Sequence, residues 1–196
     1  MSAATKKQIR HDHLERALEK NPFLTDEQLA NTLDVSIQTI RLDRLALGIP
    51  ELRERTKHMA VEAQDKLQAI ASEDIVGELI DLEVGSSGIS MMQVTPAMVL
   101  QKTGVARGHY MFAQANSLAL AVIDAPAALT GVANVKYKVP VYSGDNLVAR
   151  AEVVRKIDDK YTIWVKIRNN NKEVFRAKFL IVSLPLERNE NNENRS

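Results

Sequence analysis

The sequence ARGHYMFAQANSLALAVID, residues 106–124, carries the one long helical pattern in the second half of the chain. Its large apolar side chains, from Met111 to Ile123, recur at the three- and four-residue spacing of a helix. Five alanines between Ala113 and Ala125 have small side chains, so strands can approach the helix closely. The stretch therefore predicts a buried helix over residues 108–124.

Short alternating segments flank this helix on both sides. Two precede it, residues 76–84 and 89–94, and four follow it, residues 133–141, 147–153, 161–167 and 174–184. Turn residues between the segments favour antiparallel pairing. An antiparallel sheet wrapped around a central helix is the hotdog fold, so we predict an α+β protein with a hotdog domain over residues 75–187. The polar residues 188–196 are predicted to form a disordered tail.

The first fifty residues follow a helical period and predict a helix-turn-helix domain over residues 1–50. Thr25 and Gln28 stand at the spacing of a capping box, which predicts the start of a helix. Ser36 is expected to cap a third helix. The apolar positions of that helix, expected to face the core, are Ile37, Ile40, Leu45 and Leu47. Residues 51–74 are predicted to be an amphipathic connecting segment, helical to about residue 71.

Polar and cationic side chains in this region suit DNA. Base edges in the major groove need short hydrogen-bonding side chains, and phosphates need cations. The cations after the third helix alternate every second residue, so they scatter around a helix, whereas an extended start would let them reach a minor groove or flanking phosphates. A plain pair of packed helices remains the alternative. The candidate DNA contacts are Ser36, Gln38, Thr39, Arg41, Arg44, Arg53, Arg55 and Lys57.

Composition narrows the class of protein. The 196 residues include 26 Lys and Arg against 25 Asp and Glu, and no Cys. Without Cys there is no disulfide, thiolate nucleophile or Cys-based zinc site, which fits a cytoplasmic protein. We find no signal sequence and no membrane-spanning run, and so expect no membrane partner. Residues 1–58 hold ten cations and nine acids, so affinity for DNA has to come from a few well-placed cations.

Arg107 is the strongest candidate for ligand binding in the second domain. It stands where the central helix begins, and free backbone N–H groups and the helix dipole favour an anion there. Its guanidinium would add a bidentate clamp for a carboxylate. The alternative is an arginine paired with a carboxylate of its own chain. Asn116, about 12 Å further along the helix, would face the same groove or be an ordinary core amide.

Three other chemistries lack support around this helix. His109 has no second ligand at metal-binding spacing, so we expect no metal site. Ser117 lies outside any G-x-S-x-G turn, which argues against a serine hydrolase. A glycine-rich phosphate loop is absent as well.

The stretch VSIQTIRLDRLALGIPELRER, residues 35–55, precedes the stretch at residues 106–124 on one chain. Together they resemble the FapR family, the malonyl-CoA-responsive repressors of fatty-acid and phospholipid synthesis in Gram-positive bacteria. The resemblance covers about residues 5–186. It implies a homodimer that binds double-stranded operator DNA and releases it when the hotdog domain binds malonyl-CoA or malonyl-acyl carrier protein. It implies neither an enzyme nor a cofactor.

The resemblance also assigns roles to single residues. Arg107 would hold the free malonyl carboxylate. The acyl tunnel would be lined by Gly108, Phe112, Asn116 and Leu129, with Leu100 standing where the family often has an aromatic residue. On the DNA side, the residues that match the recognition helix are Gln38, Thr39, Arg41 and Arg44, and Arg55 matches a linker cation that resembles a minor-groove contact.

A hotdog acyl-CoA thioesterase with a helical extension is the alternative function. Residues 139–147 resemble a segment common in those enzymes. Such an enzyme needs a carboxylate on or near the central helix as base or nucleophile. Residues 108–123 contain no Asp or Glu, and only Asp124 lies close by, at the end of the helix.

Overall fold

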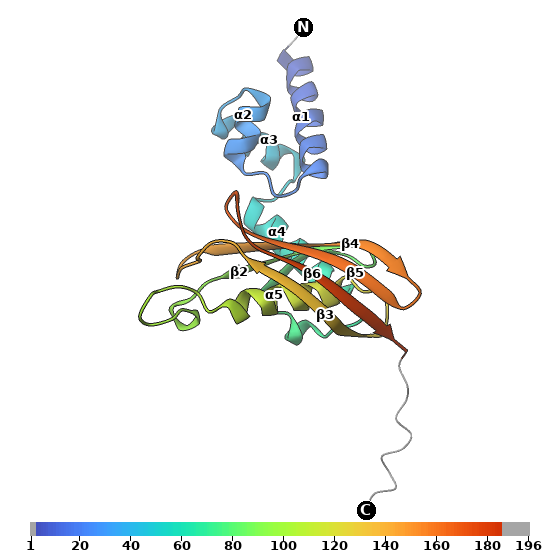
Figure 1. Ribbon diagram of the computed structural model, residues 1–196. Helices are drawn as coiled ribbons and strands as arrows, with labels where there is room; N and C mark the ends of the chain where they lie inside the picture. Colours follow the sequence, from blue (N-terminus) through green and yellow to red (C-terminus); the bar gives the residue numbers. More distant parts are fainter. Residues whose placement is uncertain (1–2, 186–196) are drawn as a thin grey trace, which may run out of the picture. The chain divides into compact units, whose positions relative to one another are not determined.

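The computed structural model describes residues 3–185, so the predicted tail at residues 188–196 lies outside it. The described residues divide into two compact units, with the division between Met59 and Ala60. The first unit contains α1 (Ala3–Lys20), α2 (Asp26–Leu33), α3 (Ile37–Leu47) and the beginning of α4 (Leu52–Asp65), which spans the division between the units (Figure 1).

The helix starts in the first unit follow from the capping residues. Thr25 accepts a hydrogen bond from the Gln28 N–H, and the Gln28 side chain accepts one from the Thr25 N–H, which completes the predicted capping box. Ser36 accepts one from the Thr39 N–H and caps α3. The short turn between α2 and α3 gives a helix-turn-helix, packed around a core of Leu14, Leu18, Leu29, Ala30 and Ile40.

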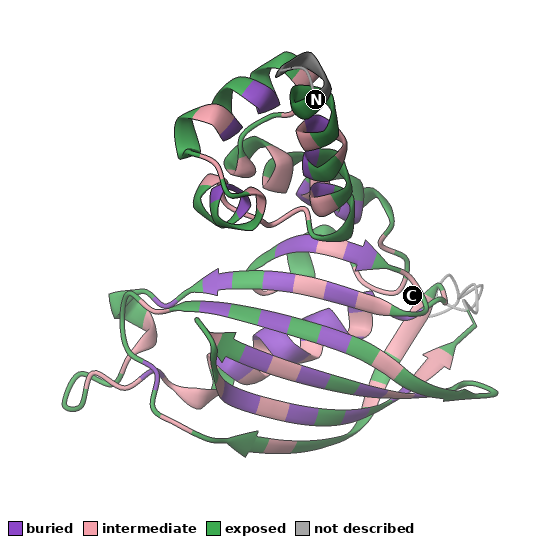
Figure 2. Ribbon diagram, turned by 90° about the horizontal axis from the view of Figure 1, so that it is seen from above, coloured by how far each residue is buried: buried purple, intermediate pink, exposed green. Residues whose placement is uncertain are grey.

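The second unit is a six-stranded antiparallel sheet in the order β1-β2-β4-β5-β6-β3. Its strands are β1 (Glu78–Glu83), β2 (Ser87–Gln93), β3 (Ala127–Tyr137), β4 (Asn146–Ile157), β5 (Lys160–Asn169) and β6 (Lys172–Leu184). Buried and exposed residues alternate along the long strands, as Figure 2 shows. One face of the sheet therefore covers the core and the other faces outward.

The predicted central helix is α5 (Gly108–Ala121), which lies along the inner face of the sheet (Figure 1). Ala115 and Ala119 are fully buried, and Phe175 and Phe179 of β6 are fully buried in the same core. These observations confirm the α+β class and the hotdog arrangement expected from the sequence. Two short 3-10 helices, Ser72–Asp74 and Pro96–Met98, complete the unit.

Three local predictions were wrong. The connecting helix ends at Asp65 rather than near residue 71, and the N–H groups of Lys66 and Leu67 bond to carbonyls three residues back instead of four. The third strand begins at Ala127 rather than at residue 133, since its pairing with β6 extends to Leu184. Leu45 and Ile37, expected in the core, are 79% and 37% exposed. None of the helices in residues 3–185 is long and apolar enough to cross a membrane.

Candidate functional site

The outward face of α3 is the candidate DNA-reading surface. Gln38 is exposed, and Thr39 is half-buried with its hydroxyl 2.9 Å from that of Ser36. The Arg41 side chain is 62% exposed, with its Nε 3.6 Å from Asp26 Oδ2. Exposed Leu42 and Leu45 complete this face and could contact the methyl groups of thymine. Arg53 and Lys57 on α4 are also exposed.

Arg44, a predicted DNA contact, is instead buried in the first unit. Its Nε and Nη2 donate to the two carboxylate oxygens of Asp26 at 2.7 and 2.8 Å, and its Nη1 donates to the Ile49 carbonyl. The Arg44 side chain is 6% exposed. The hydrogen bonds from Arg44 lower the pKa of Asp26 below its usual range. Arg44 thereby attaches the last turn of α3 to the beginning of α2.

Arg55, the predicted minor-groove contact, is also engaged within the first unit. Its guanidinium donates to the backbone carbonyls of Pro22, Leu24 and Pro50, at 3.2, 2.8 and 2.6 Å. Burial lowers the pKa of Arg55 below its usual value. In this conformation the side chain attaches the beginning of α4 to the turn before α2.

A second ion-pair cluster, overlooked at the level of sequence, holds α3 from its other side. Asp43 accepts bidentate hydrogen bonds from Arg10 and a third contact from His11 Nε2 at 2.9 Å. The Asp43 side chain is 3% exposed. The Arg10 hydrogen bonds, and secondly that of His11, lower the pKa of Asp43. α3 is therefore attached to α1 by Asp43 and to α2 by Arg44.

In the second unit, Arg107 stands at the N-cap of α5 as predicted, and its side chain does not cap the helix. Its guanidinium donates to the carbonyls of Ala97 and Met98 and to the Tyr110 hydroxyl, and lies 5.3 Å from the centre of the Tyr110 ring. No acid within residues 3–185 forms an ion pair with it. The alternative of an own-chain carboxylate partner therefore has no support among those residues.

Three further predicted ligand residues lie at four-residue intervals along α5. The Gly108 carbonyl accepts a hydrogen bond from the Tyr137 hydroxyl at 3.1 Å. The Phe112 ring packs against Phe179 with their centres 5.9 Å apart. Asn116 Oδ1 accepts from the Thr130 hydroxyl at 2.7 Å. Residues four apart share one side of a helix, and here that side faces β3 and β6. The structure thus places Gly108, Phe112 and Asn116 on one side of α5, whereas the Arg107 side chain contacts Ala97, Met98 and Tyr110.

A cavity of about 370 Å³ opens beside the first turn of this helix. Its walls are mostly apolar, and its lining includes Val105, Gly108, Met111, Tyr137 and Val141. No local pattern in the sequence singles out Tyr137, because its contact with Gly108 joins positions 29 residues apart.

Leu129 and Leu100 do not join this group within one chain. Leu129 is 61% exposed and is adjacent to Thr130, whose side chain points at α5, so the alternation of the strand directs Leu129 to the opposite face. Leu100 is 48% exposed in the loop before α5.

Comparison with known proteins gives close relatives. A protein named Transcription factor FapR from Caldanaerobacter subterraneus subsp. tengcongensis is 53% identical over 184 residues, which cover 94% of this chain and 92% of that protein. The chain belongs to the FapR family. A Transcription factor FapR from Halalkalibacterium halodurans is 46% identical over 176 residues, 90% of this chain and 95% of that protein. No family model matches this FapR-family chain.

Solved structures share the fold of the second unit. The PaaI protein of the Escherichia coli phenylacetic acid degradation operon superposes with a TM-score of 0.52 at 17% identity, covering 66% of this chain and 96% of that one. The Campylobacter jejuni virulence protein Cj0977 gives a TM-score of 0.60 at 19% identity, covering 65% and 91%. At these identities the likeness concerns the hotdog fold alone.

Proposed function

We propose that this FapR-family chain is a transcriptional repressor of fatty-acid and phospholipid biosynthesis genes that binds operator DNA and releases it on binding malonyl-CoA. The observation that carries the proposal is Arg107, an arginine at the start of α5 that pairs with no acid in residues 3–185. A malonyl thioester offers a free carboxylate for that guanidinium and for the backbone N–H groups of the helix start. Malonyl-acyl carrier protein carries the same carboxylate and is the second candidate effector.

We propose that the protein acts as a homodimer in the cytoplasm, where its operator lies. β3 is an eleven-residue strand at the edge of the sheet, hydrogen-bonded to β6 on one side. Exposed apolar side chains, including Leu129 and Val132, follow this edge. Long exposed edges of this kind favour pairing with another chain. A second copy would also bring two recognition helices to a palindromic operator, about one DNA turn apart.

DNA reading in this proposal rests on Ser36, Gln38, Thr39, Arg41, Arg53 and Lys57, which the structure leaves at least partly exposed. We assign Arg44 to positioning α3, since its guanidinium is taken up by Asp26 and the Ile49 carbonyl. Arg55 could reach a minor groove only by giving up its three carbonyl contacts.

Thioester hydrolysis fits the site less well. The groove side of α5 carries the amide Asn116 where a hydrolase would need a carboxylate, and an amide takes up no proton at neutral pH. Asp124 follows the end of the helix and is exposed. Should acyl-CoA hydrolysis be detected, Asp124→Ala tests whether that carboxylate performs it.

The deciding experiment measures operator binding by anisotropy with and without malonyl-CoA. We expect at least a tenfold weakening by the ligand, equivalent to about 1.4 kcal/mol of coupling. Arg107→Ala should keep operator affinity and lose the response, whereas Arg155→Ala, an exposed arginine on β4, should keep both. Acetyl-CoA, which lacks the free carboxylate, should bind much more weakly in calorimetry. Unchanged operator affinity at saturating malonyl-CoA would refute the proposal.

A further inference from the structure

The outer face of the sheet carries a row of cations on four adjacent strands. Arg150 of β4 is the direct partner of Lys166 on β5, which is the partner of Arg176 on β6, which is the partner of Lys136 on β3. Directly opposed residues of antiparallel strands share a face. With strands about 4.8 Å apart, the row spans about 14 Å. We call these four residues the cation row.

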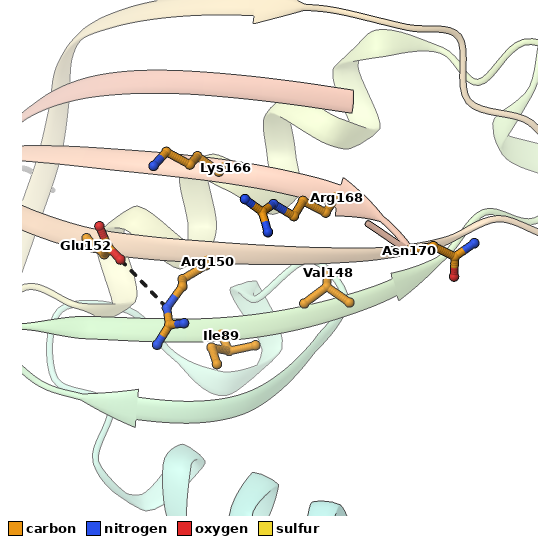
Figure 3. A pocket seen from close by; sticks show the side chains of 7 residues that line it. All are labelled: Ile89, Val148, Arg150, Glu152, Lys166, Arg168 and Asn170. Atoms are coloured by element: carbon orange, nitrogen blue, oxygen red, sulfur yellow. Dashed lines mark ion pairs between the residues drawn. The ribbon is translucent and has the colours of Figure 1, made fainter. Parts of the chain in front are cut away.

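The surroundings of the cation row add further positive charge. Arg168 and Lys178 lie on the same face, since they alternate with buried residues in β5 and β6. Figure 3 shows Arg150, Lys166 and Arg168 around one pocket, together with Ile89 and Val148. The pocket encloses about 400 Å³.

Four acids on the same face offset part of this charge. Asp81 and Glu83 of β1 lie on it, because Asp81 pairs with Ile89, the partner of Arg150, and Glu83 pairs with Ser87, the partner of Glu152. Glu152 lies 3.8 Å from Arg150, and both side chains are more than half exposed, so the pair contributes little to stability. Glu173 is shared between Arg176 and Lys138, and their hydrogen bonds lower its pKa to about 2. At neutral pH the face remains positive.

The repulsion between the like charges of the cation row lowers the stability of the folded sheet. Like charges directly opposite one another in a sheet repel and destabilise the pairing. Arg150 faces Lys166, and Lys166 in turn faces Arg176, so two successive pairs are of this unfavourable kind. A row of four is also longer than one phosphate group requires, and its length suits a polyanion.

The helix-turn-helix unit also uses several of its cations internally. Arg44 is bound to Asp26, Arg10 to Asp43, and Arg55 to three carbonyls. Affinity for DNA depends largely on cations that contact phosphates. Seven of the ten cations in residues 1–58 are exposed, and the second unit adds a further group of cations on one face of its sheet.

We infer that the cation row and Arg168 contact the phosphate backbone of DNA and supply part of the sequence-independent affinity of the repressor. This inference rests on the proposed function, because it takes operator DNA as the partner. Base reading would remain with α3, and the outer face of the sheet would add electrostatic attraction to any duplex.

The test is the salt dependence of DNA binding by the full chain carrying Arg150→Gln and Lys166→Gln. The slope of log affinity against log salt concentration should become shallower by about one for each phosphate that the variant no longer neutralises. At low salt, affinity should fall on the order of tenfold. Operator and unrelated duplexes should lose affinity by the same factor, because phosphates carry no sequence.

A matched control removes the same charge elsewhere. Lys66→Gln with Lys102→Gln changes two exposed lysines that lie on no strand of the sheet and should leave the slope near that of the wild type. The single change Lys166→Glu gives an independent readout, because it places an acid between Arg150 and Arg176. Its melting temperature should rise while its DNA affinity falls, whereas a purely structural role for Lys166 would lower both.

The outcomes separate this inference from the proposed function. A wild type that does not bind the operator would defeat the proposed function itself. Operator binding with the same salt slope in the row variant and its control would overturn only the inference. Loss of binding to poly-glutamate, with DNA binding unchanged, would overturn it in favour of an acidic protein as the partner.

Discussion

Asp43 and Arg44 are consecutive residues of α3, yet their buried charges are paired with different helices. Asp43 binds Arg10 and His11 of α1, and Arg44 binds Asp26 of α2. The two ion pairs fix both the rotation and the tilt of the recognition helix. Each pair is largely buried, so removing one partner leaves an uncompensated charge.

Asp43→Asn should therefore loosen the first unit and weaken operator binding without affecting the effector site. Breaking a buried pair of this kind costs about 3 kcal/mol. Hydrogen exchange of α1 and α3 should become faster, while calorimetric affinity for malonyl-CoA stays at the wild-type value. Asp34→Asn, at an exposed turn position, is the matched control. Wild-type exchange rates in the Asp43 variant would contradict the role given to this residue.

Acidification should weaken the first unit in the same region. The pKa of Asp43 and that of Asp26 are lowered in the folded chain, by Arg10 and Arg44 respectively. Their contribution to stability is full above the unfolded value of about 4 and is lost as pH falls through the lower folded values. Hydrogen exchange of residues 8–49, followed from about pH 5.5 downward, should show protection declining below about pH 4. Asp43→Asn should flatten this dependence, and an equally steep decline in the variant would argue against it.

Gly108→Ala should change the effector site more than the stability of the fold. A Cβ at this position would lie 2.9 Å from Cε1 of Tyr137, so the half-exposed ring would have to move. Because the ring lines the cavity, its displacement should weaken malonyl-CoA binding, while the melting temperature changes little. The double variant Gly108→Ala with Tyr137→Ala relieves the clash. If binding in the double variant is no better than in Gly108→Ala, the tyrosine is not the cause.

Arg55→Lys tests the attachment of α4 within the first unit. Lysine cannot reach three carbonyls in the planar fork that arginine provides, so hydrogen bonds to Pro22, Leu24 and Pro50 should be lost in part. We expect a loss of about 1–2 kcal/mol in unfolding free energy. Arg53→Lys, at an exposed neighbouring position, should be neutral in the same denaturation experiment. Equal stabilities of the two variants would show that the carbonyl contacts contribute nothing.

Local signals in the sequence predicted the elements well. The capping box at Thr25 depends on residues three apart, and the pattern of α5 depends on residues three and four apart. Both patterns lie within one short segment, so they can be recognised without knowing any distant contact. The same holds for the alternation that predicted β4 and β5, since each strand has one buried face.

The remaining features could not be predicted from the sequence, because they depend on contacts between segments far apart in the chain. In α3 the core-facing positions are Ile40, Asp43, Arg44 and Leu47, whereas hydrophobic periodicity predicted Ile37 and Leu45 there. It gave no reason to bury the two charged residues Asp43 and Arg44. Only their partners in α1 and α2, 33 and 18 residues away, reveal why they can be buried. The cation row is likewise visible only once the register of four strands is known.

The edge strand β3 has a consequence for how the chain is made. Its neighbour within the sheet is β6, and residues 138–171 separate the two strands. During translation β3 is therefore synthesised before β6, the strand it pairs with. The hairpins β1–β2 and β4–β5 can form from neighbouring segments. We expect β3 to be the last strand to gain amide protection in pulse-labelled refolding. Until then its apolar residues stay exposed and favour aggregation, which a low protein concentration or chaperones would limit.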